Sequence, residues 1–360
     1  MKFIHISDVH LGVEPDAGRE WSKKRARDIW DSFGEVVLEA GRQKVDFLFI
    51  SGDLFHRQPL KRELKEVNYL FEQIPEVKVV FMAGNHDYLQ PKSYYLDFPW
   101  AENVSFFAKE ELEALDFPAE NVTVYGLSYW HRQISQRLYD ELWVQNENRM
   151  NILLAHGGTE KQIPFLPRQI LSNGIDYIAA GHIHKASYMV EDRAVMAGAL
   201  EPTDCNDVGP HGYWIGELVK EENDIRRNLS FCPIKKCEYR HETILVTPDT
   251  TQYALEEMVR ACVAEGEPYM RYRIFLEGRI NPDCEFDYTQ IEQMGQIVDV
   301  TANLMPDYNY DKMMEEQSDS MLGRYIARMK KEPQDVVTKK ALEMGVNALL
   351  GYENRRSKDF

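Results

Sequence analysis

The stretch KFIHISDVHLG, residues 2–12, decides the fold of this chain, because an apolar run ends there in the polar pair Asp8 and His10. Four more apolar runs end in the same way: VDFLFIS before Asp53, VKVVFM before Asn85, NILLA before His156 and IDYIAA before His182. Short apolar runs of this kind are typical of strands buried in a parallel sheet. Since parallel strands bring their carboxyl ends to one edge, these polar side chains are predicted to converge on one crevice.

Helical periodicity alternates with these runs and predicts an α/β fold. Residues 23–43 form one expected amphipathic helix, with Ile29, Phe33, Val36, Val37 and Ala40 on a common face, and residues 62–74 form a second. After His184 the short runs ASYMV, AVMAGAL, HGYWIGELV and RNLSFCPI, with turn residues between them, indicate antiparallel strands that close a second sheet. We therefore expect a two-sheet sandwich flanked by helices.

The polar residues at the strand ends are the types that bind divalent metals. The candidate ligands are Asp8, His10, Asp53, Asn85, His156, His182 and His184. Residues i and i+2 of an extended chain point to one side, so each of the pairs in SDVH and GHIH could aim two ligands at one place. Glycines directly before Asp53, Asn85 and His182 are expected to let a metal or phosphate approach the backbone. Carboxylate, imidazole and amide oxygen suit manganese, iron or zinc, with manganese the first choice.

Two metals would explain the size of this set. A bridging carboxylate is needed between them, and Asp53 is the expected bridge. Such a pair lowers the pKa of a shared water, gives hydroxide at neutral pH and neutralises charge on a phosphoryl group. His86 follows Asn85 directly and could contact the phosphate or protonate the leaving alkoxide. Any one of these fragments alone is weak evidence for a metal site, since a buried histidine bonded to a backbone carbonyl is the commoner finding. All five fragments, each after an apolar run, together predict a metal site that hydrolyses phosphate esters.

The motifs SDVHLG, GDLFH, GNHD, AHG and GHIH resemble those of the calcineurin-like metallophosphoesterase superfamily over about residues 1–235. The resemblance implies one metal held by Asp8, His10, Asp53 and His184, and a second held by Asp53, Asn85, His156 and His182. It also implies that His86 is a catalytic histidine. No ligand of the family pattern is missing from this sequence.

Within the superfamily, GDLFHRQPL and MAGALEPTD are similar to the SbcD-type nuclease group of DNA repair. That likeness implies that His56, three residues after Asp53, helps to position the nucleotide or the catalytic histidine; an exposed loop residue is the alternative. It further implies a DNA exonuclease or endonuclease that partners DNA and an SbcC-like coiled-coil ATPase subunit, with homodimerisation left open. The alternatives are a phosphodiesterase or phosphatase for small nucleotides or phosphoproteins, and a non-catalytic scaffold.

Patterning predicts three regions. Residues 1–238 form the expected nuclease domain, 239–305 a small α/β capping domain, and 306–360 a helical segment. That segment reads as two helices, over 311–331 and 335–351, which could dock on the ATPase or pack on their own chain. No apolar span nears twenty residues and the first residues enter a strand, so a cytoplasmic protein without membrane contact is expected.

Charge opposes tight DNA binding by this chain alone. The formal net charge is −17, whereas nucleic-acid binders usually carry a basic face. Two local clusters could rim the crevice, one of Lys23, Lys24, Arg25 and Arg27, the other of Arg57, Lys61, Arg62 and Lys65. Each cluster alone is more often a solvated helix face.

Overall fold

A computed structural model describes residues 1–221 and 225–351. Within them the chain divides into two compact units, one over Met1–Tyr239 and one that begins at Arg240. The expected borders at 238/239 and 305/306 stay a prediction. In the described parts of the chain, no helix has the length and apolar character to cross a bilayer.

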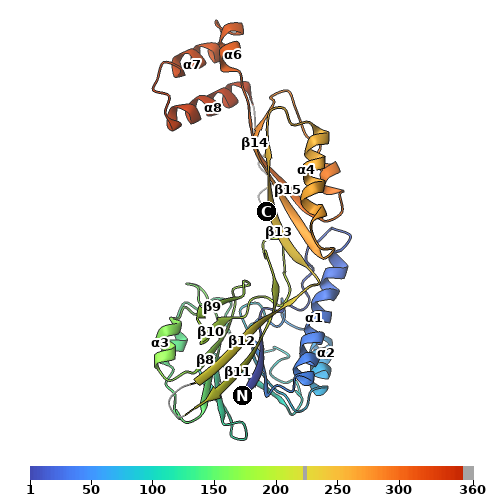
Figure 1. Cartoon of the computed structure of the whole chain (residues 1–360). Helices are drawn as coiled ribbons and strands as arrows, with labels where there is room; N and C mark the ends of the chain where they lie inside the picture. Colours follow the sequence, from blue (N-terminus) through green and yellow to red (C-terminus); the bar gives the residue numbers. More distant parts are fainter. Residues whose placement is uncertain (222–224, 352–360) are drawn as a thin grey trace. The chain divides into compact units, whose positions relative to one another are not determined.

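The first unit is a sandwich of two six-stranded sheets (Figure 1). The first sheet has the order β12-β11-β1-β2-β3-β4, and the second has the order β5-β6-β7-β8-β10-β9. The first sheet's strands are β1 (Lys2–Ile6), β2 (Phe47–Ser51), β3 (Lys78–Met82), β4 (Val104–Phe107), β11 (His211–Lys220) and β12 (Ile225–Ile234). The second sheet's strands are β5 (Glu113–Phe117), β6 (Val122–Gly126), β7 (Met150–His156), β8 (Tyr177–Gly181), β9 (Ser187–Val190) and β10 (Ala194–Met196). The expected α/β sandwich is confirmed.

The five apolar runs are the parallel strands at the centre of the two sheets. β1 pairs with β2 and β2 with β3 in parallel, and β7 pairs with β8 in parallel. One expectation was wrong: β11 and β12 do not close the second sheet, because β11 runs antiparallel to β1 and places this hairpin at the edge of the first. Pairing across two hundred residues has no local signature, so the sequence pattern could not reveal it.

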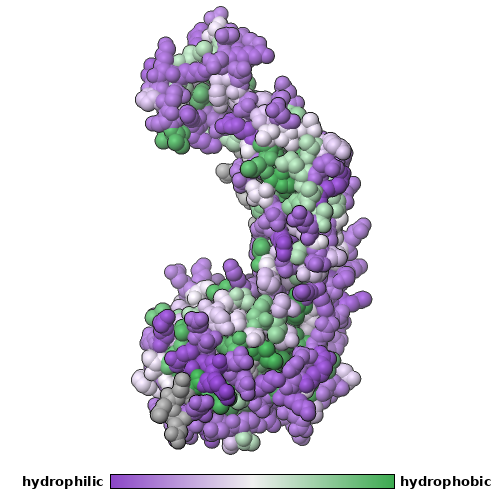
Figure 2. Space-filling view, in the orientation of Figure 1, coloured by the Kyte–Doolittle hydropathy of each residue, from purple (hydrophilic) through white to green (hydrophobic). Residues whose placement is uncertain are grey.

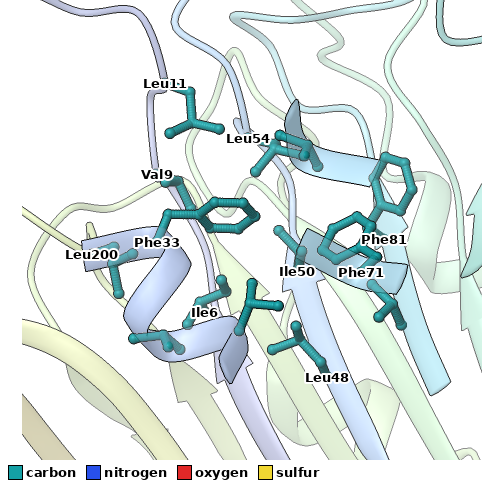
Figure 3. Packing of buried hydrophobic residues seen from close by; sticks show 14 of the residues in the cluster. Ile6, Val9, Leu11, Phe33, Leu48, Ile50, Leu54, Phe71, Phe81 and Leu200 are labelled. Atoms are coloured by element: carbon teal, nitrogen blue, oxygen red, sulfur yellow. The ribbon is translucent and has the colours of Figure 1, made fainter. Parts of the chain in front are cut away.

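Helices cover the outer faces of both sheets. α1 (Ser22–Arg42) and α2 (Lys61–Glu72) lie on the first sheet, and α3 (Pro167–Ser172) lies on the second. The five α1 residues that share the expected apolar face are all buried, and Figure 3 shows Phe33 of α1 packed among Ile6, Ile50 and Leu54. A separate core, with Phe49 and Val80 opposite Ile152 and Leu154, fills the space between the sheets. A short 3-10 helix (Leu138–Glu141) precedes β7.

The second unit combines a three-stranded sheet with helices. Its strands are β13 (Glu238–Val246), β14 (Met270–Ile280) and β15 (Ile297–Pro306), and its helices are α4 (Gln252–Ala264), α5 (Tyr288–Glu292), α6 (Tyr310–Glu316), α7 (Met321–Met329) and α8 (Val336–Leu350). Up to residue 351, where the described chain ends, the C-terminal segment thus has three helices where two were expected. They pack on one another through Leu322, Ile326, Leu342 and Val346, so these residues are a local core. Figure 2 shows mostly hydrophilic residues on the surface in this view.

Candidate metal centre

All seven candidate ligands lie at the carboxyl ends of the central parallel strands. Asp8 and His10 follow β1, Asp53 follows β2 and Asn85 follows β3. From the second sheet, His156 is the last residue of β7, whereas His182 and His184 follow β8. The site is therefore assembled from both sheets of the sandwich, and most of its residues are buried.

The local backbone that aims these side chains is not extended, and in this respect the i, i+2 argument was wrong. β1 ends at Ile6, and Asp8 and His10 have φ of 48° and 50°. Asp53 at 51° and His182 at 103° also have positive φ. Non-glycine residues seldom adopt this conformation because Cβ is crowded, so four of the seven candidates occupy strained backbone.

Two glycines at the site make room for candidate ligands. The expectation that glycines here also let a metal or phosphate approach stays a prediction. A Cβ on Gly84 would lie 2.3 Å from Oδ1 of Asp53, and one on Gly52 would lie 2.4 Å from Nδ1 of His156. Any side chain at these positions would displace a candidate ligand of a neighbouring strand.

Asp8, His10 and His184 form the first group of converging donors. Nε2 of His10 and Nε2 of His184 are 3.1 Å apart. Oδ2 of Asp8 accepts a 2.9 Å hydrogen bond from the backbone N–H of His182. Oδ1 of Asp8 is buried and has no hydrogen-bond partner among the described residues. A buried carboxylate oxygen in this state is costly unless a cation lies beside it.

A second group surrounds the amide oxygen of Asn85. Its Oδ1 is 3.0 Å from Nε2 of His156 and 3.0 Å from Nδ1 of His182. Oδ2 of Asp53 lies between the two groups, 3.4 Å from Nε2 of His156 and 3.9 Å from Nε2 of His10. Donors held by one ion at about 2.0–2.2 Å are separated by comparable distances. The residues present therefore fit two cations that share Asp53.

Electrostatics divide the histidines into two kinds. Burial lowers the pKa of His10 to about 3, and burial together with His156 lowers the pKa of His182 to about 4. Burial would also lower the pKa of His156, but the Asp53 carboxylate outweighs it and raises that pKa to about 9. Burial opposes ionisation of Asp53 as well, yet His156 and His10 hold the pKa of this carboxyl well below its usual range. The site thus concentrates a buried negative charge between imidazoles.

His86 and His56 lie beside the candidate ligands. The backbone N–H of His86 donates to Oδ1 of Asp53 at 2.8 Å, and the His86 ring centroid is 4.8 Å from that of His10. Nδ1 of His56 is 3.3 Å from Nδ1 of His10, and the backbone oxygen of His56 accepts from Nδ1 of His86 at 3.3 Å. Both rings are partly exposed, so they can meet a substrate that the buried residues cannot reach.

Two carboxylates that support the site were not among the predicted residues. Asp207 accepts a 2.9 Å hydrogen bond from Nδ1 of His184, and Thr203 donates to the same oxygen from its backbone N–H and its hydroxyl. A carboxylate behind a histidine fixes which ring nitrogen is left to bind a metal. No signal in the sequence connects Asp207 with His184, because the contact depends on how the intervening segment, which includes β9 and β10, folds back.

Asp87, the other supporting carboxylate, ties the loops after β2 and β3 together. It accepts from the backbone N–H of Phe55 at 3.1 Å, from that of Gly84 at 2.8 Å and from the Tyr95 hydroxyl at 2.7 Å. Burial, reinforced by Asp53, raises the pKa of Asp87 to about 7. The sequence signal that could have identified Asp87 is its position directly after His86 in the motif GNHD.

In each of the two basic clusters, one arginine is paired with a carboxylate of the same chain. Arg25 is only 2% exposed and is bonded to Glu201 at 3.1 Å, so it supports the interior. Arg57 is paired with Glu63 at 2.8 Å. Only part of the charge counted in the sequence is therefore free to meet an anionic ligand.

Comparison with known proteins agrees with this geometry. A family model described as Calcineurin-like phosphoesterase matches residues 1–186. An uncharacterized metallophosphoesterase, YhaO, of Bacillus subtilis is 28% identical over 236 residues, which cover 60% of this chain and 57% of that protein. Proteins named DNA double-strand break repair protein Mre11 also match: that of Sulfurisphaera tokodaii at 29% over 226 residues (59% and 56%), and that of Archaeoglobus fulgidus at 40% over 250 residues (62% and 55%). The chain spans little more than half the length of these curated relatives.

Proposed function

This chain belongs to the calcineurin-like phosphoesterase family, and on that premise we propose that it is a metal-dependent DNA phosphodiesterase of the SbcD type, an exonuclease or endonuclease of DNA repair. The observation that carries the proposal is the convergence of seven donor residues and His86 on one site. The names of the Mre11 relatives, which refer to repair of DNA double-strand breaks, favour DNA as the substrate.

In this proposal Asp8, His10, Asp53 and His184 hold one divalent ion, and Asp53, Asn85, His156 and His182 hold the other, with manganese the preferred metal. Bound ions supply an activated water and neutralise charge on the phosphoryl oxygens. The unpartnered Oδ1 of Asp8 supports the first set, and the position of Asp53 Oδ2 between His10 and His156 supports a bridging role for that residue.

His86 is assigned the acid-base role. Its backbone is fixed by Asp53 and its ring lies beside His10, so the imidazole can contact a phosphate at the site and give a proton to the departing alkoxide. His56 is assigned a positioning role, since its backbone oxygen accepts from Nδ1 of His86 and orients that ring. This contact leaves Nε2 of His86 to carry the transferred proton.

The decisive experiment separates metal binding from catalysis. Labelled single-stranded, blunt-ended and hairpin DNA are incubated with the protein in manganese, and bound metal is measured by elemental analysis. Asp53→Ala is expected to lose both metal and cleavage, whereas His86→Ala is expected to keep the metal and lose cleavage. His131→Ala, at an exposed histidine paired with Glu110, is the matched control and should change neither. Metal loss in His86→Ala would contradict its assigned role.

Net acidity favours a second candidate, a phosphodiesterase or phosphatase for small nucleotides or phosphoproteins. It predicts hydrolysis of a cyclic nucleotide or of bis-p-nitrophenyl phosphate, with every DNA form left intact whichever metal is supplied. A metal-loaded protein inert towards all of these substrates would instead favour a non-catalytic scaffold.

The C-terminal helices support a proposed partner, an SbcC-like coiled-coil ATPase subunit. Although their central residues pack on one another, α8 leaves Val337 76% and Met344 61% exposed. Apolar side chains exposed on one helix are suited to helix-in-groove docking. In the same proposal residues 239–305 form a capping domain; homodimerisation and a cytoplasmic location remain predictions.

Full-length Val337→Asp/Met344→Asp is expected to lose co-purification with the ATPase, and so is a truncation after residue 305. The control variant Lys312→Asp/Lys339→Asp changes the charge of the segment but keeps its apolar side chains. It is expected to co-purify with the ATPase as the wild type does. Undiminished co-purification of the truncated chain would remove the docking idea.

A further inference from the structure

A pocket separate from the candidate ligands lies in the first unit, with a volume of about 300 Å³. It lies between β9, at the edge of the second sheet, and the hairpin β11–β12, at the edge of the first. Its walls include Lys185, Tyr188, Val208, His211, Trp214 and Phe231. Figure 2 shows hydrophobic residues exposed among hydrophilic ones on the face where β11 and β12 lie.

Strand register places this pocket at the same end of the sandwich as the metal centre. Trp214 of β11 pairs with His5, one residue before β1 ends. In the second sheet, Ser187 of β9 pairs with Met196 of β10, and Met196 pairs with Ala180, one residue before β8 ends. Both walls of the pocket are therefore level with the strand ends that carry the candidate ligands.

The pocket is also continuous in sequence with the residues that hold His184. Lys185 follows His184 directly, and Val208 follows Asp207, whose carboxylate accepts from the His184 ring. One segment of the pocket wall thus begins one residue after His184, and a second begins one residue after the carboxylate that orients the His184 ring. The pocket therefore adjoins, along the chain, one candidate ligand and the residue that orients it.

Three aromatic rings, those of Tyr188, Trp214 and Phe231, line the pocket and pack against one another. The ring centroids of Tyr188 and Trp214 are 5.0 Å apart, and those of Trp214 and Phe231 are 5.5 Å apart. Tyr188 is 42% exposed, so part of its side chain is accessible to a ligand. Lys185 adds an exposed cation at the rim. Aromatic side chains with a neighbouring positive charge are the elements with which proteins stack bases and hold the adjoining phosphate.

We propose that this pocket binds the purine or pyrimidine ring of the nucleotide whose phosphate lies at the metal centre, and that Tyr188 stacks on that ring. The inference rests on the proposed function, because it takes the substrate to be a nucleotide. It adds a base-binding subsite to a reaction that otherwise involves only phosphate. Since stacking needs only a planar ring, the subsite accepts every base.

Binding is measured first, without turnover. Deoxyadenosine monophosphate and deoxyribose 5-phosphate are titrated by calorimetry into metal-free full-length protein. The nucleotide is expected to bind at least tenfold more tightly, and Tyr188→Ala to remove that difference. Tyr188→Phe keeps the ring and should keep the difference, as should Tyr69→Ala, at an exposed tyrosine of α2. Equal affinities for the two ligands, or a difference that survives Tyr188→Ala, would overturn the proposal.

Cleavage then distinguishes a base within DNA from a free nucleotide. Two oligonucleotides are compared in manganese, one intact and one abasic at the nucleotide to be cleaved. The wild type is expected to show kcat/KM about tenfold higher for the intact oligonucleotide, a ratio that falls to about one in Tyr188→Ala. Base-dependent binding without DNA cleavage would reject the proposed nuclease and keep the subsite for free nucleotides. Cleavage with no preference for the base would reject the subsite and keep the nuclease.

Discussion

At the scale of single residues, the site depends on close contacts between the candidate ligands and the residues around them. Gly84 is directly against Asp53, and Asp207 holds the ring of His184 from behind. Neither residue is a candidate ligand, yet each determines where a ligand atom lies. Substitutions there test the arrangement without removing any donor.

Gly84→Ala is expected to abolish manganese binding, because the added Cβ would lie 2.3 Å from Oδ1 and 2.6 Å from the backbone nitrogen of Asp53. Overpacking of this kind also costs about 1–3 kcal/mol of stability. Elemental analysis and urea unfolding measure the two effects. The control is Gly34→Ala in α1, whose nearest neighbour would be a Leu70 methyl at 3.8 Å; it should keep the metal and unfold no more easily. Full metal occupancy in Gly84→Ala would contradict the close packing.

Asp207→Asn is expected to weaken metal binding about 10- to 100-fold, because an amide no longer fixes and polarises the His184 ring. Calorimetric titration with manganese gives the affinity. Asp204→Asn, three residues earlier and exposed, is the matched control and should bind as the wild type does. Equal affinities for the two variants would show that Asp207 does not support the site.

At the scale of elements, local patterns predicted the central strands and α1 because burial leaves a periodic trace in the sequence. The same patterns indicated the candidate ligands, since each lies within four residues after one of those strands or, for His156, ends it. They could not predict the left-handed turns at Asp8 and His10, which neighbouring loops impose, or the pairing of β11 with β1. Contacts between distant segments, such as that of Asp207 with His184, carry no local trace either.

One such contact ties α1 to the turn after β10. Arg25 of α1 is bonded to Glu201, which also accepts from Ser32, and both members of the ion pair are almost fully buried. Glu201→Ala removes the closer of the two carboxylates that face the buried guanidinium, leaving Asp28 at 3.5 Å, and is expected to cost about 3 kcal/mol of unfolding free energy. Urea unfolding provides the measurement. Glu39→Ala, which removes a pair with the exposed Arg42 on the same helix, should cost no more than about 1 kcal/mol. Similar losses of unfolding free energy in the two variants would show that the buried ion pair stabilises the fold no more than the exposed one.

At the scale of the whole molecule, the chain consists of two compact units with separate hydrophobic cores. All candidate ligands belong to the first unit, between Asp8 and His184. Any stabilisation by metal should therefore act on this unit directly. The three-stranded sheet and the C-terminal helices contribute no donor to either group.

Removal of metal by a chelator is expected to lower the Tm of the first unit. A ligand present at 100 times its Kd stabilises the folded state by about 2.7 kcal/mol, which corresponds to roughly 5–10 °C for a unit of this size. Differential scanning calorimetry with and without manganese measures the shift. Asp53→Ala should show no shift on chelation, and a shift as large as that of the wild type would place the metal elsewhere.

The two sheets of the sandwich divide the donors between them. The first sheet supplies both carboxylates, the amide and one imidazole, and the second sheet supplies the three remaining imidazoles. A bound cation would therefore be held by side chains from both sheets and would link the two layers. Correct packing of the two sheets against each other is thus a precondition for bringing all seven donors together.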